Sequence, residues 1–406
     1  MLRLIIVLVI MAIIDIYSFQ ALREWVRPYS DWTRRISYGI YWALTALAVL
    51  YLLINVFEWN ESWSKSMKTL GRAFVFLVYV CKIPIVGILL IDDLRRGITY
   101  VINQLSPTAN YDVSRSRFLS SFGLLMGGIP FATLTYGIVR NQYRFKRYAA
   151  DVPVEGLPKE LDGLKIVQIS DMHSGSWTRL EPLQRAVDMI NEEAADVVCF
   201  TGDIVNDKAE EMEPFVNIFK QISAKHGVYS VLGNHDYGDY AQWKDKAAKQ
   251  ANMEQLFDVH RRLGWDLLRD EHRLLEINGR KFGVLGVENW SAKRFGKRGD
   301  LKKAHAGSEL ADAKILLSHD PTHWEAQVQN YPDIDLTLSG HTHGFQFGIE
   351  IPGIRWSPAQ YIYKQWAGLY QAGRQHLYVN RGLGFLGYPG RVGILPEISV
   401  LTLRTA

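Results

Sequence analysis

The stretch "IDLTLSGHTHGFQ", residues 334–346, places two histidines directly after an apolar run and between two glycines. The run from Ile334 to Leu338 predicts a strand, and side chains two positions apart on an extended chain point to the same side. His341 and His343 are therefore expected side by side. Two charged imidazoles at this spacing would repel each other, so the pattern favours neutral rings that share a cation. Taken alone, it is also compatible with a polar surface turn.

Four other apolar runs also end in side chains that can bind metal. Because open α/β sheets place their sites at the carboxyl ends of strands, such residues can converge although they are far apart in sequence. Any one of them has an ordinary explanation as a cap, a turn or a buried histidine. Their coincidence predicts one common site. The runs are "LKIVQISDMH" with Asp171 and His173, "DVVCFTGD" with Asp203, "VYSVLGNHD" with Asn234, His235 and Asp236, and "KILLSHD" with His319.

The pattern from Leu164 onward, short apolar runs alternating with amphipathic segments, indicates an α/β fold. Apolar residues recur at three and four positions in residues 180–193 and 210–222, which predicts helices there. Strands are expected at residues 164–170, 197–201, 228–232, 282–287, 315–318, 334–338, 376–380 and 398–403.

The motifs D-x-H, G-D, G-N-H-D, a single H and G-H-x-H, in this order, resemble the calcineurin-like metallophosphoesterase superfamily over about residues 160–406. The tail "YVNRGLGFLGYPGRVGILPEISVLTL", residues 378–403, is similar to the membrane-associated bacterial branch of YkuE-like and YaeI-like phosphoesterases. The resemblance implies a four-layer metallophosphoesterase β-sandwich flanked by helices. It also implies hydrolysis of a phosphoric ester.

The resemblance implies two divalent metal ions, manganese, iron or zinc, because the ligands mix nitrogen and oxygen. Asp203 would bridge the ions, and a hydroxide between them would attack phosphorus. His235 would act on the leaving oxygen, so Asp203 and His235 are the expected catalytic residues. One ion would be held by Asp171, His173, Asp203 and His343, and the other by Asp203, Asn234, His319 and His341.

The sequence departs from the protein phosphatases of this superfamily, which have GDxxDRG and GNHE where this chain has "GDIVNDK" and "GNHD". This difference favours a phosphodiesterase or pyrophosphatase over a protein phosphatase. Asp207 and Asp236 are candidates to orient His235. Arg381, Gly382 and Arg391 are candidates to clamp a phosphate, although helix capping or surface pairing explains the arginines equally well.

The first third of the chain is rich in apolar residues, and flanking tryptophans fit a membrane interface. It predicts a membrane domain, residues 1–148, with a bundle of about four transmembrane helices, followed by the phosphoesterase domain, residues 149–406. The predicted spans lie near residues 2–18, 36–57, 72–91 and 118–139. We therefore expect a multi-pass protein of the cell inner membrane. Buried helices of a soluble domain are the weaker alternative.

The orientation in the membrane is not decided by loop charges, which are balanced. An export-like segment with Arg115 and Arg117 favours a cytoplasmic position for these arginines, which places the catalytic domain outside. The alternative, that they are ordinary interfacial arginines, is open. The net charge of +4 suits anionic headgroups better than nucleic acid. The expected partners are membrane lipids and a phosphorylated lipid or lipid-linked substrate, with no nucleic acid; the oligomeric state is open.

Two other functions remain possible at this level. A catalytically weak metal-binding regulatory or receptor module can share the scaffold, although every ligand position is filled. In a transporter or receptor the helices would do the work, and Asp15 and Lys82 would be its ionisable groups. Both residues are expected near helix ends, which weakens this interpretation. The cysteines Cys81 and Cys199 fall in different regions and predict no disulfide framework.

Overall fold

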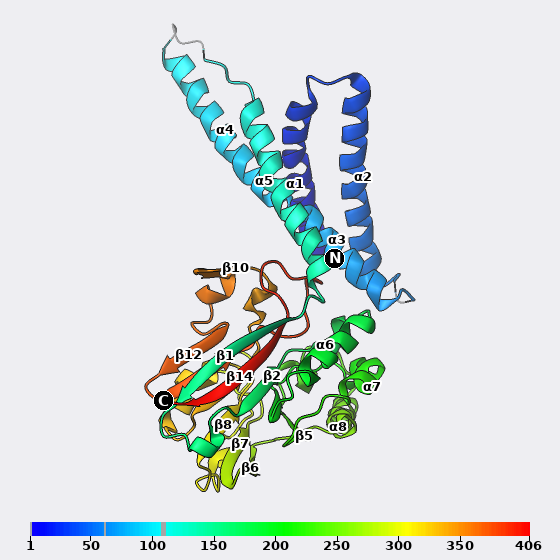
Figure 1. The fold of residues 1–406 in the computed structure, drawn as a ribbon. Coiled ribbons are helices and arrows are strands. Elements are labelled where there is room, and N and C mark those ends of the chain that lie inside the picture. The colour runs from blue at the N-terminus through cyan, green and yellow to red at the C-terminus, as the bar shows by residue number, and fades with distance from the viewer. Residues whose placement is uncertain (1, 61, 107–110) are drawn as a thin grey trace. The chain divides into compact units, whose positions relative to one another are not determined.

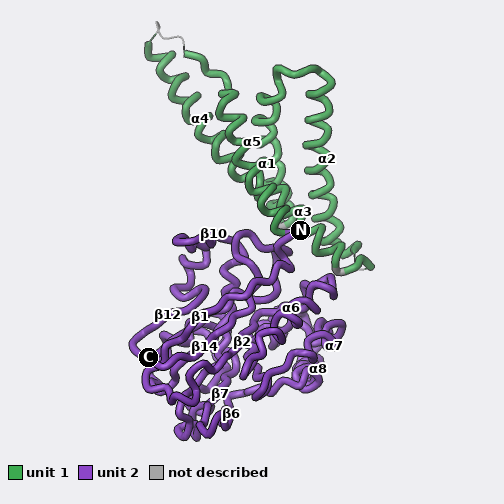
Figure 2. The backbone as a smooth tube through the Cα atoms, in the orientation of Figure 1, with its two compact units in different colours: residues 1–137 green, residues 138–406 purple. Residues whose placement is uncertain are grey.

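The computed structural model describes the chain except for residues 1, 61 and 107–110. The chain divides into two compact units, Met1–Gly137 and Ile138–Ala406 (Figure 2). The division precedes the boundary expected at residue 148. The physical reason is that the strand β1 begins at Lys146 and pairs with the last strand of the chain, so these residues belong to the second unit.

The first unit consists of apolar helices. Among the residues that the structure describes, four segments are long and apolar enough to cross a membrane, Leu4–Val26, Asp31–Val56, Ser66–Leu105 and Arg117–Asn141. This confirms the expectation of four spans, and each segment is longer than expected. The third segment comprises two helices that meet at Cys81. Pro84 lies in the first turn of the second one, where its missing N–H interrupts the helical ladder. The helices are α1 (Leu2–Val26), α2 (Asp31–Val56), α3 (Lys65–Val80), α4 (Lys82–Leu105) and α5 (Arg117–Tyr136).

Asp15 and Lys82 form a buried ion pair inside this helical unit. Asp15 lies in the middle of α1, so the expectation that it is near a helix end was wrong. Its carboxylate also accepts hydrogen bonds from Thr45 (3.2 Å) and Tyr79 (2.8 Å). Charged groups among apolar helices are tolerated when they are paired and hydrogen-bonded, so this cluster is explained by helix packing.

The second unit contains two six-stranded mixed sheets and one two-stranded hairpin (Figure 1). The first sheet has the order β1-β14-β2-β3-β4-β5 and the second β12-β13-β9-β8-β7-β6. The strands are β1 (Lys146–Val154), β2 (Lys165–Ile169), β3 (Val197–Phe200), β4 (Val228–Ser230), β5 (Asp266–Leu267), β6 (Glu271–Ile277), β7 (Arg280–Gly286), β8 (Ala313–Leu317), β9 (Leu336–Ser339), β10 (Ile349–Ile351), β11 (Ile354–Trp356), β12 (Gly368–Ala372), β13 (Gln375–Val379) and β14 (Glu397–Thr405).

Alternation along the strands produces the four layers. In β2, Ile166 packs between the two sheets, whereas Val167 and Ile169 face the helices α6 (Glu181–Asn191), α7 (Val216–Phe219) and α8 (Lys246–Leu263). The outer face of the second sheet is covered by α9 (Leu301–His305) and α10 (Thr322–Ala326). Each sheet therefore has one apolar face toward the other sheet and one toward helices. This arrangement confirms the expected four-layer α/β architecture.

The local predictions are confirmed for the eight strands and for the helix at residues 180–193. The helix expected at residues 210–222 was wrong in part, because residues 209–215 form 3₁₀ turns and only Val216–Phe219 is α-helical. Pro214 accounts for the difference, since it cannot donate to an α-helical ladder. The parallel strands β2, β3 and β4 of one sheet and β8 and β9 of the other deliver their following loops to one edge of the sandwich.

Candidate metal centre

The loops after β2, β3, β8 and β9 bring six of the predicted ligands into two groups. Asp171, His173 and His343 form one group with mutually close ligand atoms, and Asp203, His319 and His341 form the other. All six side chains are buried or nearly so. Residues separated by about 170 positions in the sequence therefore converge, as the strand-end motifs predicted.

The first group is tight. His173 Nε2 lies 3.0 Å from His343 Nε2, and His343 Nε2 lies 3.2 Å from an oxygen of Asp171. Two ring nitrogens that face each other beside a carboxylate form a donor set suited to one cation. The His173 side chain is fully buried, and its Nδ1 has no hydrogen-bond partner among the described residues.

The second group shares atoms with the first. Asp203 Oδ2 lies 3.1 Å from His319 Nε2 and 3.6 Å from His173 Nε2, so this carboxylate stands between the two groups. His341 Nδ1 is 3.3 Å from His319 Nε2. His319 donates from Nδ1 to the Thr201 carbonyl (2.7 Å), which leaves Nε2 facing the centre. The geometry fits the expected bridging position of Asp203.

Asn234 lies in the same pocket but outside the two groups of three. Its Nδ2 donates to the Tyr240 hydroxyl (2.9 Å), and its buried Oδ1 has no hydrogen-bond partner in the described part of the chain. A buried amide oxygen without a partner is costly unless a cation or water satisfies it. The Asn234 side chain therefore fits an oxygen ligand, and with it the donor set suits two divalent ions.

The ligand loops have an unusual backbone. Asp171, His173, Asp203, His341 and His343 have positive φ angles of 51°, 46°, 60°, 70° and 51°. Non-glycine residues adopt this conformation at an energetic cost that the surrounding structure must offset, and such residues cluster at functional sites. The sequence did not predict this feature.

Glycines before the ligands allow the loops to approach each other. A Cβ on Gly340 would lie 2.1 Å from an Asp171 carboxylate oxygen, and one on Gly233 would lie 2.2 Å from an Asp203 oxygen. No larger residue fits at either position without displacing a ligand. The G-H and G-N dipeptides in the motifs therefore have a steric cause.

Burial and neighbouring charges shift the site's protonation. Burial together with the charge of His343 lowers the pKa of His173 to about 3, so this imidazole is neutral. Burial would also lower the pKa of His319, but Asp203 outweighs it and raises the pKa to about 10. Burial opposes ionisation of Asp171 and Asp203, but the histidines beside them hold both pKa values below the usual range. Both carboxylates are therefore charged and able to bind cations.

His235 lies beside the ligands and belongs to neither group. Its Nδ1 donates to the Asn206 carbonyl (2.7 Å), and its backbone N–H donates to Asp203 Oδ1 (2.8 Å). The expectation that Asp207 or Asp236 orients this ring was therefore wrong: the partner is a backbone carbonyl. Asp236 instead accepts from the backbone N–H groups of Gly233, Asp203, Ile204 and Val205.

The proposed phosphate clamp was also wrong. Arg381 is buried and paired with Glu397 and Glu350, both at 2.5 Å. Arg391 is fully buried and donates to the carbonyls of Arg381 (2.7 Å) and Gly382 (3.0 Å). Both guanidinium groups hold the C-terminal loops behind the ligands. The alternative of surface pairing does not describe them either, because both side chains are buried.

The site opens into a pocket of about 450 Å³. Its mouth is apolar and includes Phe295, Phe345, Leu386 and Tyr388, while Trp366 and Phe385 are buried in the core. Tyr363 lines the pocket as well.

Sequence reasoning did not predict that Tyr363 and Asp320 face His341. The Tyr363 hydroxyl lies 3.0 Å from His341 Nε2, and an Asp320 oxygen lies 3.6 Å from the same atom. Asp320 follows His319 directly in "KILLSHD", so its position was a usable signal. Tyr363 comes from an irregular segment without a motif, and nothing in the sequence indicated its contact with His341.

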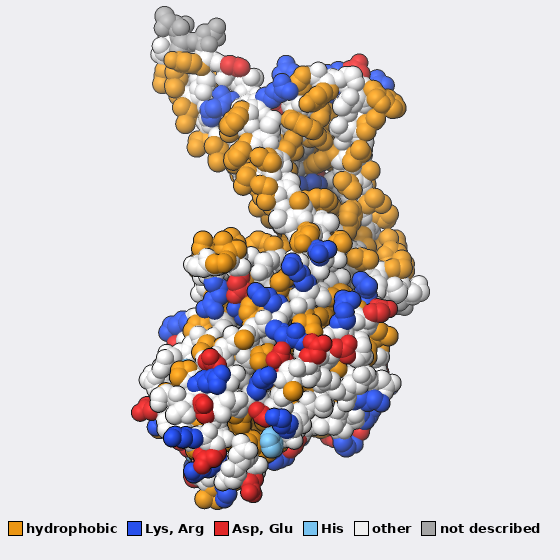
Figure 3. All heavy atoms as spheres, in the orientation of Figure 1, with side chains coloured by type: hydrophobic (Ala, Val, Ile, Leu, Met, Phe, Trp, Pro, Cys, Tyr) orange, Lys and Arg blue, Asp and Glu red, His pale blue; other side chains and the backbone are white. Residues whose placement is uncertain are grey.

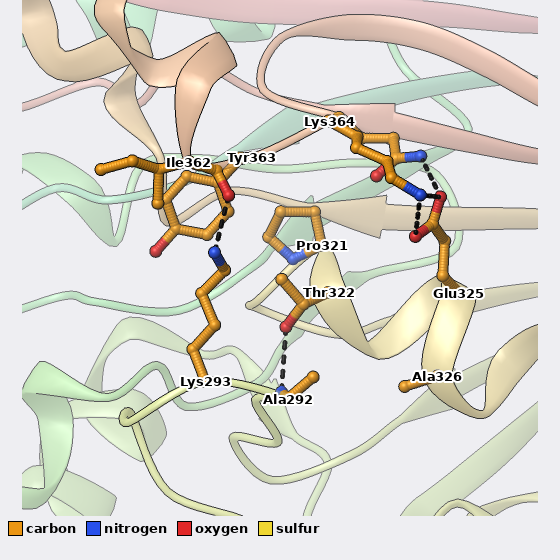
Figure 4. Close-up of a pocket in the computed structure, with 10 residues that line it drawn as sticks. Ala292, Lys293, Pro321, Thr322, Glu325, Ala326, Ile362, Tyr363 and Lys364 are labelled. Atoms are coloured by element: carbon orange, nitrogen blue, oxygen red, sulfur yellow. Dashed lines mark hydrogen bonds and ion pairs between the residues drawn. The ribbon is translucent and has the colours of Figure 1, made fainter.

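A second pocket also has Tyr363 in its lining (Figure 4). Its polar side chains are engaged with each other or with the backbone: Lys293 donates to the Ile362 carbonyl (2.6 Å), and Lys364 pairs with Glu325 at 3.2 Å. The lysines are therefore used for structure, and we assign no ligand to this pocket.

Comparisons with known proteins agree with this geometry. The family model for calcineurin-like phosphoesterases matches residues 164–345, and the model described as probable calcineurin-like phosphoesterase, transmembrane domain, matches residues 2–142. The metallophosphoesterase YkuE of Bacillus subtilis is 32% identical over 302 residues, covering 72% of this chain and 98% of that protein. The chain belongs to the calcineurin-like metallophosphoesterases.

Two further similarities accompany this assignment. The transmembrane protein with metallophosphoesterase domain of Danio rerio is 31% identical over 279 residues, covering 67% of this metallophosphoesterase and 60% of that protein. The solved phosphopantetheinyl hydrolase of Mycobacterium tuberculosis aligns with a TM-score of 0.34 and 14% identity, over 56% of this chain and 91% of that one. The metallophosphoesterase therefore combines four apolar spans with an α/β domain that carries two Asp/His groups able to hold metal ions.

Proposed function

We propose that the protein hydrolyses a phosphodiester or pyrophosphate bond in a phosphorylated lipid or a lipid-linked cell-envelope compound. The observation that carries this proposal is the pair of ligand groups joined by Asp203 at the base of a pocket whose mouth is apolar. The chain also has four candidate membrane spans, so a bilayer is its working environment.

The ligands divide naturally between two divalent ions, manganese, iron or zinc. Asp171, His173 and His343 would hold one, His319, His341 and Asn234 the other, and Asp203 both. When bound, two divalent ions would supply positive charge for a phosphate and would lower the pKa of a water molecule that could serve as the nucleophile. The orphaned Asn234 oxygen and the facing imidazole nitrogens are the structural support for this loading.

His235 is the proposed acid for the leaving oxygen. Since its Nδ1–H is held by the Asn206 carbonyl, the other ring nitrogen is the one that can exchange a proton with substrate in the pocket. Its backbone N–H also donates to the Asp203 carboxylate, which holds the proposed acid and the bridging ligand next to each other. Position beside the ligands, and not among them, suits general acid catalysis.

The pocket mouth favours a substrate with an apolar part. Phe295, Phe345 and Leu386 offer no charge to a phosphopeptide, and the arginines once considered for phosphate binding are engaged elsewhere. We further propose that the catalytic unit lies outside the inner membrane, on the strength of Arg115 and Arg117 before the last span. Outer-leaflet lipids and lipid-linked intermediates would then be within its reach.

The test uses the full chain in detergent with added manganese. We expect turnover of bis-p-nitrophenyl phosphate to exceed that of p-nitrophenyl phosphate, and phosphate or nucleotide release from a panel of phospholipids and lipid pyrophosphates. The Asp203→Ala variant is the control for contaminating hydrolases. Loaded wild-type protein that hydrolyses neither chromogenic ester nor any lipid of the panel would reject hydrolysis and favour the regulatory alternative.

A further inference from the structure

The hairpin β10–β11, sequence "IEIPGIRW" at residues 349–356, has its apolar face turned outward. Its register pairs Ile349 with Trp356 and Ile351 with Ile354, so these four side chains share one face. The three isoleucines are 49%, 55% and 54% exposed. A hairpin on a protein surface that faces water normally buries such a row of apolar side chains, because the hydrophobic effect favours their removal from water.

The opposite face of the hairpin is polar and is held by the body of the unit. Glu350 accepts hydrogen bonds from Arg381 (2.5 Å) and the Tyr148 hydroxyl (3.0 Å). Its cross-strand partner Arg355 lies over the rings of Trp366 and Tyr370. Because Arg381 and Tyr148 fix Glu350 toward the body of the unit, the outward isoleucines are a built feature of the fold and not a frayed loop.

Further apolar side chains extend this surface. Tyr361 is 75% exposed and lies beside Trp356, whose indole N–H donates to the Tyr361 hydroxyl (3.3 Å). Ile362 and Phe347 are exposed as well. Hydrophobic side chains gather over β10 in the space-filling view (Figure 3). Contiguous exposed patches of this kind mark interaction sites, and tryptophan and tyrosine at the rim are typical of membrane interfaces.

The same chain indicates which partner covers the surface. The last candidate span ends at Asn141 and β1 begins at Lys146, and five peptide units reach at most about 18 Å. A bilayer is thus always close to this unit. Lys146 stacks on the ring of Tyr148, the residue that binds Glu350, so a positive charge lies at the base of the hairpin and can meet anionic headgroups.

We propose that the outward face of β10–β11, with Trp356 and Tyr361, inserts into the lipid bilayer and docks the catalytic unit on it. The chain runs from His343 and Phe345 in the pocket directly into this hairpin, so docking holds the pocket mouth near the headgroups. This inference goes beyond hydrolysis and does not depend on which bond is cleaved.

The test attaches an environment-sensitive fluorophore to Ile351→Cys in the full chain, reconstituted in phosphatidylethanolamine and phosphatidylglycerol vesicles with doxyl-labelled lipids. The native cysteines are buried, so the parent protein treated with the same reagent gives the background. Glu276→Cys, on the exposed strand β6 at the end of the unit away from β10, is the matched control (Figure 1). An interfacial depth of about 5–10 Å predicts quenching at least about threefold above this control.

A second variant separates docking from folding. Adding Ile349→Ser and Ile354→Ser to Ile351→Cys should reduce quenching to the level of the control. Turnover of bis-p-nitrophenyl phosphate in detergent should be unchanged, because no isoleucine contacts the ligands. Equal quenching at Ile351→Cys and Glu276→Cys would overturn the proposal, as would efficient disulfide formation between Ile351→Cys copies without quenching, which would assign the surface to a second copy of the chain. Quenching without any phosphoesterase activity would leave docking standing while rejecting the proposed function.

Discussion

Asp236→Asn should weaken both the fold and the metal centre, although Asp236 binds no metal in the arrangement described. Its buried carboxylate holds the loop of Asp203 against the loop of Asn234. Oδ2 accepts from the N–H groups of Asp203 and Gly233, both at 2.8 Å. Oδ1 accepts from Ile204 at 2.8 Å and Val205 at 3.3 Å.

The expected loss of stability follows from these four hydrogen bonds. An asparagine has one carbonyl oxygen, so in either orientation of its amide two N–H groups face an NH₂ group. Each buried donor left without a partner costs about 1–3 kcal/mol, and two therefore cost about 2–6 kcal/mol. For a unit of this size, 1 kcal/mol lowers the melting temperature by about 2–4 °C, so a decrease of at least about 4 °C is expected.

The assay compares the full chain with Asp236→Asn and with Asp207→Asn, a matched control on the same loop, partly exposed and away from the ligands. Thermal unfolding and bound-metal content are measured for each protein. Loss of the positive-φ conformation at Asp203 should also reduce metal content at limiting manganese. An Asp236→Asn protein that melts within about 1 °C of wild type with full metal content would refute the role assigned to these four hydrogen bonds.

Four further predictions address the site, the topology and the core. Asp203→Ala should lose both metal ions, because its carboxylate stands between the two groups; elemental analysis that finds one ion retained contradicts the bridge. His235→Ala should keep its metal but lose about 100-fold to 10,000-fold in rate, less with good leaving groups; an equal loss across leaving groups of different pKa speaks against an acid. Alkaline phosphatase fused after Tyr148 should be active if the catalytic unit is outside, and fluorescence of a cytoplasm-only reporter would reverse the topology. Burial lowers the pKa of His260 to about 3, from 6.5, so the folded state binds fewer protons than the unfolded state. The free energy of unfolding therefore falls as pH drops below about 6.5, by up to about 1.4 kcal/mol per pH unit. In denaturant titrations, the difference in this free energy between pH 5 and pH 7 should be smaller for His260→Gln than for wild type, and an unchanged difference would contradict this assignment.

The ligand set was predictable because each ligand follows a strand. The parallel strands β2, β3, β8 and β9 carry strong apolar signals, and the rule that sites form at the carboxyl ends of strands needs no knowledge of side-chain rotamers. The sequence therefore placed Asp171, Asp203 and the His341/His343 pair together. It did not place the partners of these residues, because Tyr363 and the Asn206 carbonyl reach the site from irregular segments.

Weak local signals explain what was missed in the fold. The strand β1, "KRYAADVPV", is the edge of its sheet, begins with two basic residues and contains a proline, so it resembles a basic linker. Charge also misled the prediction for Arg381 and Arg391. A guanidinium near a phosphoesterase site suggests phosphate binding. In the structure, however, Arg381 pairs with Glu397, and Arg391 donates hydrogen bonds to four backbone carbonyls.

The hairpin β10–β11 shows where pattern reasoning ends. The alternation in "IEIPGIRW" indicates that Ile349 and Ile351 share one face of the strand and that Glu350 lies on the other. An alternation with a period of two residues does not indicate which of the two faces packs against the core. In isolation, burial of the isoleucines is the favoured choice. The structure makes the opposite choice because Arg381, 31 residues away and itself paired with Glu397, offers Glu350 a buried partner. A charged residue with a fixed partner can thus turn an apolar row toward the outside, and the partner is known only when the fold is known. The outward row is stable in a chain that is held at a bilayer, since the lipid provides the apolar environment that the protein core does not.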